Sequence, residues 1–366
     1  VEDGPVVAML QSNVPQSVKR AFESGQELFD GLMEDSEAAV EAGAELIIWP
    51  ETMVQAMLDQ GVWPFLVSSD EQEAYDAALK EHAKEQAYVL VGAYGAEVRQ
   101  DGRDRYLARY NSAFLYRPDG RQDPKRYDKI HLVPFGEVLP LRRSFAWFYE
   151  LLMKIKFIPY NYDYSLDYGS QYTIFEMAPP GLRPDERRAT MDDGPETMRF
   201  GVMICYEDTV PAIAREFALD EQGRKGLDWL VNISNDGWFV RFKREQVVPS
   251  AELPQHAAVC VFRAVENRLA VLRSVNTGIS CVIDSFGRIR DGYLAGTLPR
   301  AAMTRTGMAG WFTDRVPIDT RVTFFSKYGE WLDFSCELCT ILVIIGPLSV
   351  RFLQSRKKKA FGKGVT

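Results

Sequence analysis

The stretch RFGVMICYEDT, residues 199–209, runs through apolar residues and then changes abruptly to a polar turn. A short, continuous apolar run of this kind is typical of a buried β-strand. Cys205 lies at the point of change, where it is either the last small residue of a core strand or a nucleophile at the strand's end. Because free cysteine is among the most frequently buried residue types, the residue taken alone favours packing.

Similar apolar runs recur along the chain and alternate with amphipathic segments. We predict helices over residues 24–42, 70–86, 210–219 and 254–268, and strands at PVVAMLQSNV, AELIIWPET, AYVLVGAY, YNSAFLY, MRFGVMIC, LDWLVNIS, LAVLRSV and GISCVID. Apolar strands that alternate with helices indicate an α/β fold with layers of sheet and helix rather than an all-β barrel.

The overall composition argues against several classes of protein. Of the 366 residues, 46% are hydrophobic, so the chain can form a sizeable core. The net charge of −8 argues against a general nucleic-acid binder. Five cysteines, an odd number in a long chain, do not indicate a disulfide scaffold. Cys336 and Cys339 form a single CxxC pair with no second pair or nearby histidine, so we expect neither a metal nor a cofactor.

The C-terminal region differs from the rest of the chain. Residues 331–353, WLDFSCELCTILVIIGPLSVRFL, are strongly apolar and lead into a cluster of Lys and Arg. A membrane-spanning helix needs about 20 apolar residues, and a cationic cluster marks its cytoplasmic end. We therefore predict a transmembrane helix at 331–353 and a basic cytoplasmic tail at 354–366. The alternative is a buried C-terminal helix with a solvated tail.

Two segments do not fit the alternation of strands and helices. Residues 141–172 are long and rich in aromatic side chains, and residues 178–197 form a polar loop rich in Pro and Gly. An exposed apolar arm marks a surface that contacts a partner or a membrane. We predict such an arm at 141–172, with a helix hairpin in the core as the alternative.

Three segments end in residues that suit acyl chemistry on a cysteine. Glu51 follows LIIWP, Cys205 follows FGVMI, and Lys129 lies in the loop KRYDKIHLVPFGEVLP. In layered α/β folds, sites gather at the carboxyl ends of strands. A carboxylate beside a thiol can accept its proton, and a lysine can stabilise the oxyanion of a tetrahedral intermediate. A Cys–His pair is the main alternative, but the surroundings of the histidines do not resemble those of papain-type enzymes.

The segments WPET, YDKIHLVPFGE and ICYED resemble the Glu–Lys–Cys segments of the nitrilase, or carbon–nitrogen hydrolase, superfamily, in the same order. NISNDGWF and RAVENRLAVLRSVNTGISCVID resemble later signatures of that superfamily. The resemblance implies an α-β-β-α sandwich for residues 1–330. It also implies that Cys205 is the nucleophile, that Glu51 is general base and then acid, and that Lys129 stabilises the oxyanion.

The same resemblance implies roles for neighbouring residues. Glu137 resembles a second glutamate that orients the lysine or an incoming amine. The backbone N–H of Tyr206 is expected to help bind the oxyanion. The residues expected to shape the pocket are Glu207, Trp238 and Asn111. Asp208 is expected to cap the helix that follows it.

Within the superfamily, QSNVPQSVK, HLVPFGEVLP, the aromatic segment and the apolar C-terminus most resemble apolipoprotein N-acyltransferases. This resemblance implies that a phospholipid donates a fatty acyl chain, through a Cys205 thioester, to the N-terminal amine of a diacylglyceryl apolipoprotein. It implies a bacterial inner membrane enzyme, with the catalytic domain on the periplasmic side and the tail in the cytoplasm.

Members of that branch carry transmembrane helices before the catalytic domain. We therefore expect the chain to be either the C-terminal part of a longer protein or a truncated relative. Two other functions stay open on the sequence alone. One is a soluble amidase that uses the same three residues to hydrolyse a small C–N bond, and the other is a membrane-anchored binding domain without catalysis.

Overall fold

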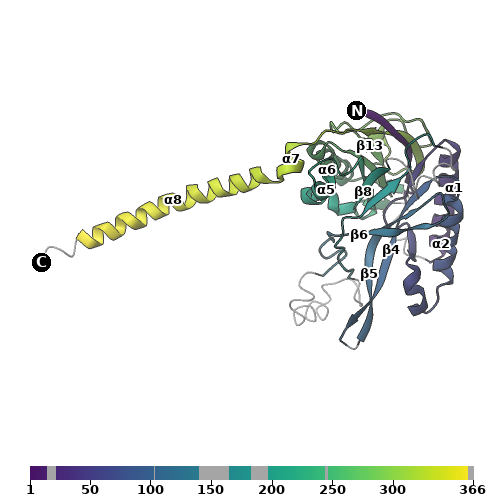
Figure 1. Cartoon of the computed structure of the whole chain (residues 1–366), viewed down its shortest axis with the longest axis horizontal. Coiled ribbons are helices and arrows are strands. Elements are labelled where there is room, and N and C mark those ends of the chain that lie inside the picture. The colour runs from purple at the N-terminus through teal and green to yellow at the C-terminus, as the bar shows by residue number, and fades with distance from the viewer. Residues whose placement is uncertain (15–21, 103, 140–164, 183–196, 244–245, 362–366) are drawn as a thin grey trace.

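Two β-sheets pack face to face, and helices cover their outer faces (Figure 1). The computed structural model describes residues 1–14, 22–102, 104–139, 165–182, 197–243 and 246–361. One apolar cluster fills the space between the sheets and continues to the helices that cover the smaller sheet, and a second lies between the larger sheet and its helices. The layers are those of the predicted α-β-β-α sandwich.

The larger sheet has eight described strands in the order β14-β15-β1-β2-β4-β5-β6, and β3 pairs with β4. Its central strands β1, β2 and β4 are parallel, so they end at one edge of the sheet. The strands are β1 Glu2–Gln11, β2 Leu46–Ile48, β3 Val54–Met57, β4 Tyr88–Asp101, β5 Asp104–Tyr116, β6 Gln122–Asp128, β14 Ala295–Gly296 and β15 Gly310–Ile318.

The smaller sheet has five described strands in the order β13-β12-β9-β8-β7. β8, β9 and β12 are parallel, and every described residue of β9 and β12 is buried because the strands lie between the other sheet and the helices. These strands are β7 Ile174–Met177, β8 Met198–Ile204, β9 Trp229–Ser234, β12 Ala270–Val275 and β13 Cys281–Ile283. A separate hairpin is formed by β10 Arg241–Lys243 and β11 Gln246–Val248.

The four predicted helices are all present, with ends that differ by a few residues. They are α1 Phe22–Glu41, α2 Asp70–Ala83, α5 Pro211–Ala218 and α6 Glu252–Asn267. The shorter helical turns are η1 Gln60–Phe65, η2 Cys205–Thr209, η3 Asp236–Phe239, η4 Ala302–Thr304 and α7 Phe324–Tyr328. α2 stops earlier than predicted because Lys84 is already extended, with ψ of 122°, and Glu85 after it adopts a left-handed conformation, with φ of 60°.

The C-terminal helix α8, Trp331–Phe361, projects away from the two-sheet body (Figure 1). Its large apolar side chains are exposed as far as they are described, so it is not the buried core helix considered as an alternative. In the parts of the chain that the structure describes, no helix has both the length and the apolar character needed to cross a membrane. The predicted transmembrane helix at 331–353 is therefore not confirmed. The uninterrupted apolar run between Glu337 and Arg351 is shorter than the about 20 residues that a span needs.

Most of the two irregular segments lies outside the described residues. Only 165–172 of the predicted aromatic arm and only 178–182 and 197 of the predicted polar loop are described. The predicted basic tail at 354–366 begins within α8, which continues to Phe361.

Candidate active site

Glu51, Lys129 and Cys205 meet at one edge of the two-sheet sandwich. They follow strands β2, β6 and β8, and all three side chains are buried. The three segments lie far apart in the sequence, but the strands that carry them end at the same edge. The structure thus brings together the three residues that the sequence analysis singled out.

The Lys129 ammonium lies between two carboxylates. Its Nζ is 3.2 Å from Glu51 Oε1 and 2.9 Å from Glu137 Oε1. Burial alone would lower the pKa of Lys129, but the charges of Glu137 and Glu51 outweigh it and raise that pKa well above its usual range. Lys129 therefore remains a cation in a buried site, which is the state required to stabilise an oxyanion.

Asn111 fixes both carboxylates at once. Its side-chain Nδ2 donates to Glu51 Oε1 at 2.7 Å and to Glu137 Oε1 at 2.8 Å. Glu137 also accepts from the backbone N–H of Val133 at 2.9 Å, and the Lys129 charge helps to lower the pKa of Glu137 although burial opposes this. Asn111 and Glu137 thus fix the positions of the Lys129 and Glu51 side chains relative to each other.

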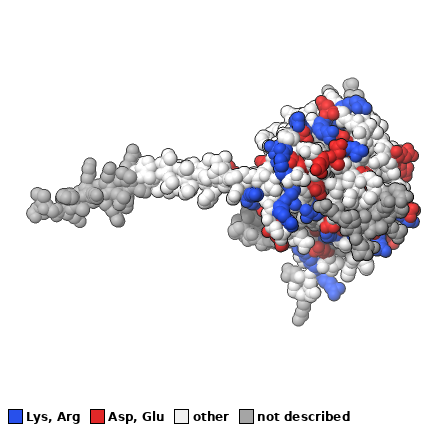
Figure 2. All heavy atoms as spheres, turned by 45° about the horizontal axis from the view of Figure 1, so that its top comes forward, with Lys and Arg blue, Asp and Glu red and all other residues white. Residues whose placement is uncertain are grey.

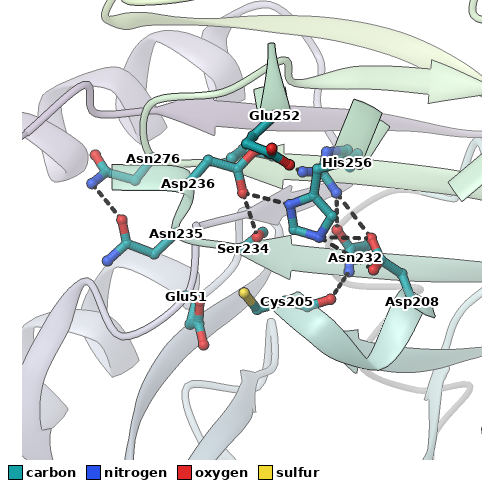
Figure 3. Close-up of polar contacts among 12 residues, drawn as sticks. Glu51, Cys205, Asp208, Asn232, Ser234, Asn235, Asp236, Glu252, His256 and Asn276 are labelled. Carbon is teal, nitrogen blue, oxygen red and sulfur yellow. Dashed lines mark hydrogen bonds and ion pairs between the residues drawn. The ribbon is translucent and has the colours of Figure 1, made fainter. Parts of the chain in front are cut away.

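Cys205 occupies an unusual backbone conformation for its residue type. Its φ is 52°, in the left-handed region, directly after the last residue of β8. In Figure 3 its sulfur points toward the carboxylate of Glu51. This turn directs the buried thiol toward Glu51 at the end of the strand. The conformation costs about 1–2 kcal/mol, and surrounding contacts must compensate for it.

The thiol of Cys205 needs a base to react. Burial and the nearby Glu51 charge raise the pKa of Cys205 well above its usual range, and the Lys129 charge opposes them only in part. At neutral pH the group is therefore a thiol and not a thiolate. Because the thiolate is the nucleophile, proton transfer to a neighbouring carboxylate is the step that would activate it.

Two other non-glycine residues at this edge adopt the left-handed conformation. Thr52, next to Glu51, has φ of 47°, and Phe135, in the lysine loop, has φ of 63°. With Cys205, each of the three segments that form the site therefore contains one such residue. Strained backbone of this kind is concentrated at functional sites.

Glu207 does not line a pocket as predicted. It is fully buried and its carboxylate accepts from the backbone N–H groups of Ile204, Ile130 and His131, and from the Tyr127 hydroxyl, at 2.6–3.0 Å. Burial raises its pKa to about 7, although these donors act in the opposite direction. Glu207 therefore ties the cysteine turn to the lysine loop, because those backbone donors would otherwise be buried without partners.

Asp208 does not cap the following helix as predicted. The N-cap residue of α5 is Val210, and the Asp208 carboxylate instead contacts His256 and Arg273. This buried charge cluster was not predicted from the sequence, although Asp236 belongs to the NISNDGW segment. The ion pairs join residues far apart in the sequence, so spacing alone gave no signal for them.

Partly exposed aromatic side chains lie on the segments that carry the site or adjoin it. Tyr206 is partly exposed and stacks on His131, with ring centroids 5.6 Å apart. Trp238 and Phe135 are about half exposed. The side chains of Tyr206 and Trp238 are thus available to an apolar substrate. No cluster of potential metal ligands occurs among the described residues.

Comparisons with known proteins agree with this geometry. The model of the family described as "Carbon-nitrogen hydrolase" matches residues 6–295. An apolipoprotein N-acyltransferase of Geobacter metallireducens is 30% identical over 96% of this chain and 54% of its own length. The protein of the same name from Thermotoga maritima is 27% identical over 98% of this chain and 54% of its own length. The chain thus spans about half the length of these curated relatives.

Solved structures show the same fold at low sequence identity. A mutant of the Nesterenkonia AN1 amidase from the nitrilase superfamily has a TM-score of 0.51 and 14% identity, covering 86% of this chain and 91% of the amidase. This likeness concerns the fold alone. Because the family model spans most of the chain, including the segments of Glu51, Lys129 and Cys205, the chain belongs to the carbon–nitrogen hydrolase family.

Proposed function

We propose that this chain is the catalytic part of an N-acyltransferase. It transfers a fatty acyl chain from a phospholipid to the N-terminal amine of a diacylglyceryl apolipoprotein. The observation that carries the proposal is the buried Glu51–Lys129–Cys205 group in a chain whose curated relatives bear the name apolipoprotein N-acyltransferase. The amidase alternative is supported by fold likeness alone.

In the first half-reaction, Glu51 accepts the proton of the Cys205 thiol while the sulfur attacks the ester carbonyl carbon of the phospholipid. The carbonyl oxygen becomes an oxyanion, which is stabilised by the Lys129 ammonium and the backbone N–H of Tyr206. The ester C–O bond then breaks, and Glu51 returns the proton to the departing alcohol oxygen. A thioester remains on Cys205 and a lysophospholipid leaves.

In the second half-reaction, the amine of the apolipoprotein attacks the thioester carbonyl. Glu51 accepts a proton from the amine nitrogen, the C–S bond breaks, and the proton returns to the sulfur of Cys205. The acyl chain is then held in an amide bond. Glu137 and Asn111 keep Lys129 and Glu51 in place through both halves. Burial of the three reacting groups favours transfer over hydrolysis because it limits the access of water to the thioester.

The exposed apolar residues of α8 support a location at a lipid membrane. Val343 and its neighbours on α8 are exposed, and the part of α8 nearest the body carries few charged side chains (Figure 2). At the base of α8, Trp331 and Phe324 are exposed and make an edge-to-face contact with centroids 5.5 Å apart. Exposed aromatic residues beside an apolar segment are typical of a membrane interface.

We place the protein at the bacterial inner membrane. The Lys and Arg residues near the far end of α8 favour the cytoplasm for that end, and the catalytic domain would then lie on the periplasmic side. In this arrangement the phospholipid donor and the lipid-modified acceptor reach the site from the same membrane.

Mass spectrometry of the acyl-enzyme tests the proposal. The full-length protein is reconstituted in phospholipid vesicles, and its peptides are mapped after rapid acid quenching. The expected result is an acyl mass on the Cys205 peptide that disappears when the apolipoprotein is added, and that is absent from the Cys205→Ala variant. A folded wild-type protein that forms no acyl adduct with phospholipid, but turns over small amides, would overturn the proposal in favour of an amidase.

A further inference from the structure

A closed ring of charged side chains lies behind the nucleophile. It consists of Asp208 in η2, Asp236 in η3, His256 in α6 and Arg273 in β12, here called the Asp–His–Arg network. Both aspartates and Arg273 have no exposed surface, and His256 is 8% exposed. Figure 3 shows the His256 ring between the two aspartates, on the side of Cys205 away from Glu51.

Each cation of the network contacts both anions. The His256 ring places Nδ1 2.8 Å from Asp236 Oδ1 and Nε2 3.1 Å from Asp208 Oδ2. The Arg273 guanidinium lies 2.8 Å from Asp236 Oδ2 and 3.2 Å from Asp208 Oδ2. A buried ion group is stable only when its charges are paired and hydrogen-bonded, and this ring meets that condition while His256 is protonated.

The network is connected to the Cys205 turn through its backbone. Asp208 belongs to the same helical turn as Cys205, and Arg263 donates to the Asp208 carbonyl oxygen at 3.0 Å. Arg273 also donates to Asn232 Oδ1 at 2.6 Å, and Asn232 Nδ2 in turn donates to the Cys205 carbonyl oxygen at 3.3 Å. Cys205, the first residue of the turn, is therefore linked to Arg273 through Asn232, and Asp208, a later residue of the same turn, contacts Arg273 directly.

A second connection runs through Ser234. Ser234 at the end of β9 donates to Asp236 Oδ1 at 2.9 Å, and both residues act on the pKa of the Cys205 thiol, which Asp236 raises and Ser234 lowers. The space that the aspartate needs is supplied by Gly278, where a Cβ would lie 2.3 Å from Asp236 Oδ2. The network is thus linked to the Cys205 carbonyl oxygen by way of Asn232, and the charge of Asp236 acts on the Cys205 thiol.

We propose that the Asp–His–Arg network is a positioning device for the nucleophile: it keeps Cys205 in its left-handed turn with the thiol beside Glu51. The inference rests on the proposed role of Cys205 and assigns to these four residues no contact with substrate. The left-handed conformation is intrinsically unfavourable for a residue with a Cβ, so it persists only where the surroundings fix it. The network supplies contacts at Asp208 and, by way of Asn232, at the carbonyl oxygen of Cys205.

The pH profile of Cys205 alkylation distinguishes positioning from mere structural support. In the wild-type protein Glu51 removes the proton as the sulfur reacts, so the rate with iodoacetamide should be nearly constant between pH 6.5 and 9. If the thiol moves away from Glu51, it reacts only after ionising by itself. Because an ordinary thiol has a pKa of about 8.5 and is only about 1% ionised at pH 6.5, the rate at pH 6.5 should then be about 100-fold below its own plateau at high pH. The charged groups near this thiol are Glu51, Lys129 and Asp236.

The experiment compares His256→Gln with the matched variant His82→Gln, which alters a buried histidine in α2. Modification is followed peptide by peptide, because Cys336 and Cys339 are exposed and will also react. Temperatures are kept well below the melting temperature of each variant. We expect the ordinary thiol profile for His256→Gln and for Glu51→Gln, and the wild-type profile for His82→Gln.

Ser234→Ala keeps the test decisive if His256→Gln does not fold, since it removes a hydrogen bond to Asp236 of the network without removing a charge. Wild-type profiles in every folded variant of the network would overturn the proposal. A wild-type Cys205 that reacts no faster at pH 6.5 than the buried Cys260 and Cys281 would instead overturn its assignment as the nucleophile. The two failures are therefore distinguishable.

Discussion

Gly92 lies directly beneath Glu51 and leaves no room for a side chain. A Cβ at position 92 would be 2.8 Å from the Glu51 Cα, and closer still to the backbone of the residues on either side. The close approach of β4 to the segment after β2 thus determines where the carboxylate stands. A glycine in a strand often marks such a close backbone approach.

Gly92→Ala should therefore lower activity by displacing Glu51, without removing any group of the site. The new methyl group meets backbone atoms, which cannot rotate away, so the Glu51 segment must shift. A displacement of about 1 Å can lower a rate about 100-fold. The measurement is the rate of acyl-adduct formation on Cys205, with circular dichroism to verify folding. Gly61→Ala is the control, because nothing lies within 4 Å of a Cβ there. Equal rates for the two variants would contradict this account of Glu51.

Lys129→Met should remove turnover but leave a folded protein. The substitution leaves Glu51 and Glu137 close together without the cation between them, and removing one partner of a buried ion pair costs about 3–5 kcal/mol. Urea unfolding measures this loss. Adding Glu137→Gln should restore part of the stability, because it removes one of the two facing charges, and should not restore activity.

Lys125→Met is the matched control for that variant. Lys125 lies on β6, the strand that Lys129 follows, and its exposed side chain pairs loosely with Glu176 at 3.8 Å. A surface pair of this kind contributes about 0–1 kcal/mol. Complete unfolding of Lys129→Met at neutral pH would show that Lys129 is primarily structural.

The sequence allowed the prediction of the layers and pointed to Glu51, Lys129 and Cys205, which the fold brings together, but not to what holds these residues. Each of Glu51 and Cys205 ends an apolar run, and parallel strands bring such ends together. In contrast, Glu207 and Asp208 are adjacent acidic residues after the same strand, yet one binds backbone N–H groups and the other pairs with Arg273. These partners depend on how distant segments pack, which local periodicity does not encode.

The stability of the protein should depend on pH through His256. Burial and the Arg273 charge oppose protonation of His256, but its hydrogen bonds to Asp208 and Asp236 outweigh them and raise its pKa to about 9. The unfolded chain has an ordinary histidine pKa of about 6.5. The stabilising contribution of protonated His256 is therefore complete below about pH 6.5 and is lost as pH rises through 9, and it amounts to about 3 kcal/mol at most.

The measurement is the free energy of unfolding of wild type and His256→Gln at several pH values between 6 and 9.5. We expect the difference between them to be largest at pH 6 and to shrink as pH rises. The charged and titratable groups around His256 are Asp208, Asp236, Arg273, Cys260 and Glu252. Burial lowers the pKa of His82, so the wild-type protein loses stability as pH falls and this histidine becomes protonated. The free energy of unfolding of His82→Gln should therefore improve relative to wild type as pH falls, which is the trend opposite to that of His256→Gln. A difference that is independent of pH for His256→Gln would contradict the proposed charge state.

The exposed apolar face of α8 should bind lipid. Val343 lies in the middle of the apolar run and is 73% exposed, a position at which a charge would oppose transfer into a membrane by about 2–3 kcal/mol. Val343→Glu should therefore weaken binding of the full-length protein to vesicles of phosphatidylethanolamine and phosphatidylglycerol. Its partition coefficient should fall at least about tenfold if no other segment anchors the protein.

Val67→Glu makes the same substitution at a fully exposed valine on the body and should leave partitioning unchanged. Vesicle flotation measures both variants, with phosphatidylcholine vesicles added to separate apolar from electrostatic binding. Equal flotation of the two variants, in a form of the protein that lacks any further membrane segment, would show that α8 does not contact lipid.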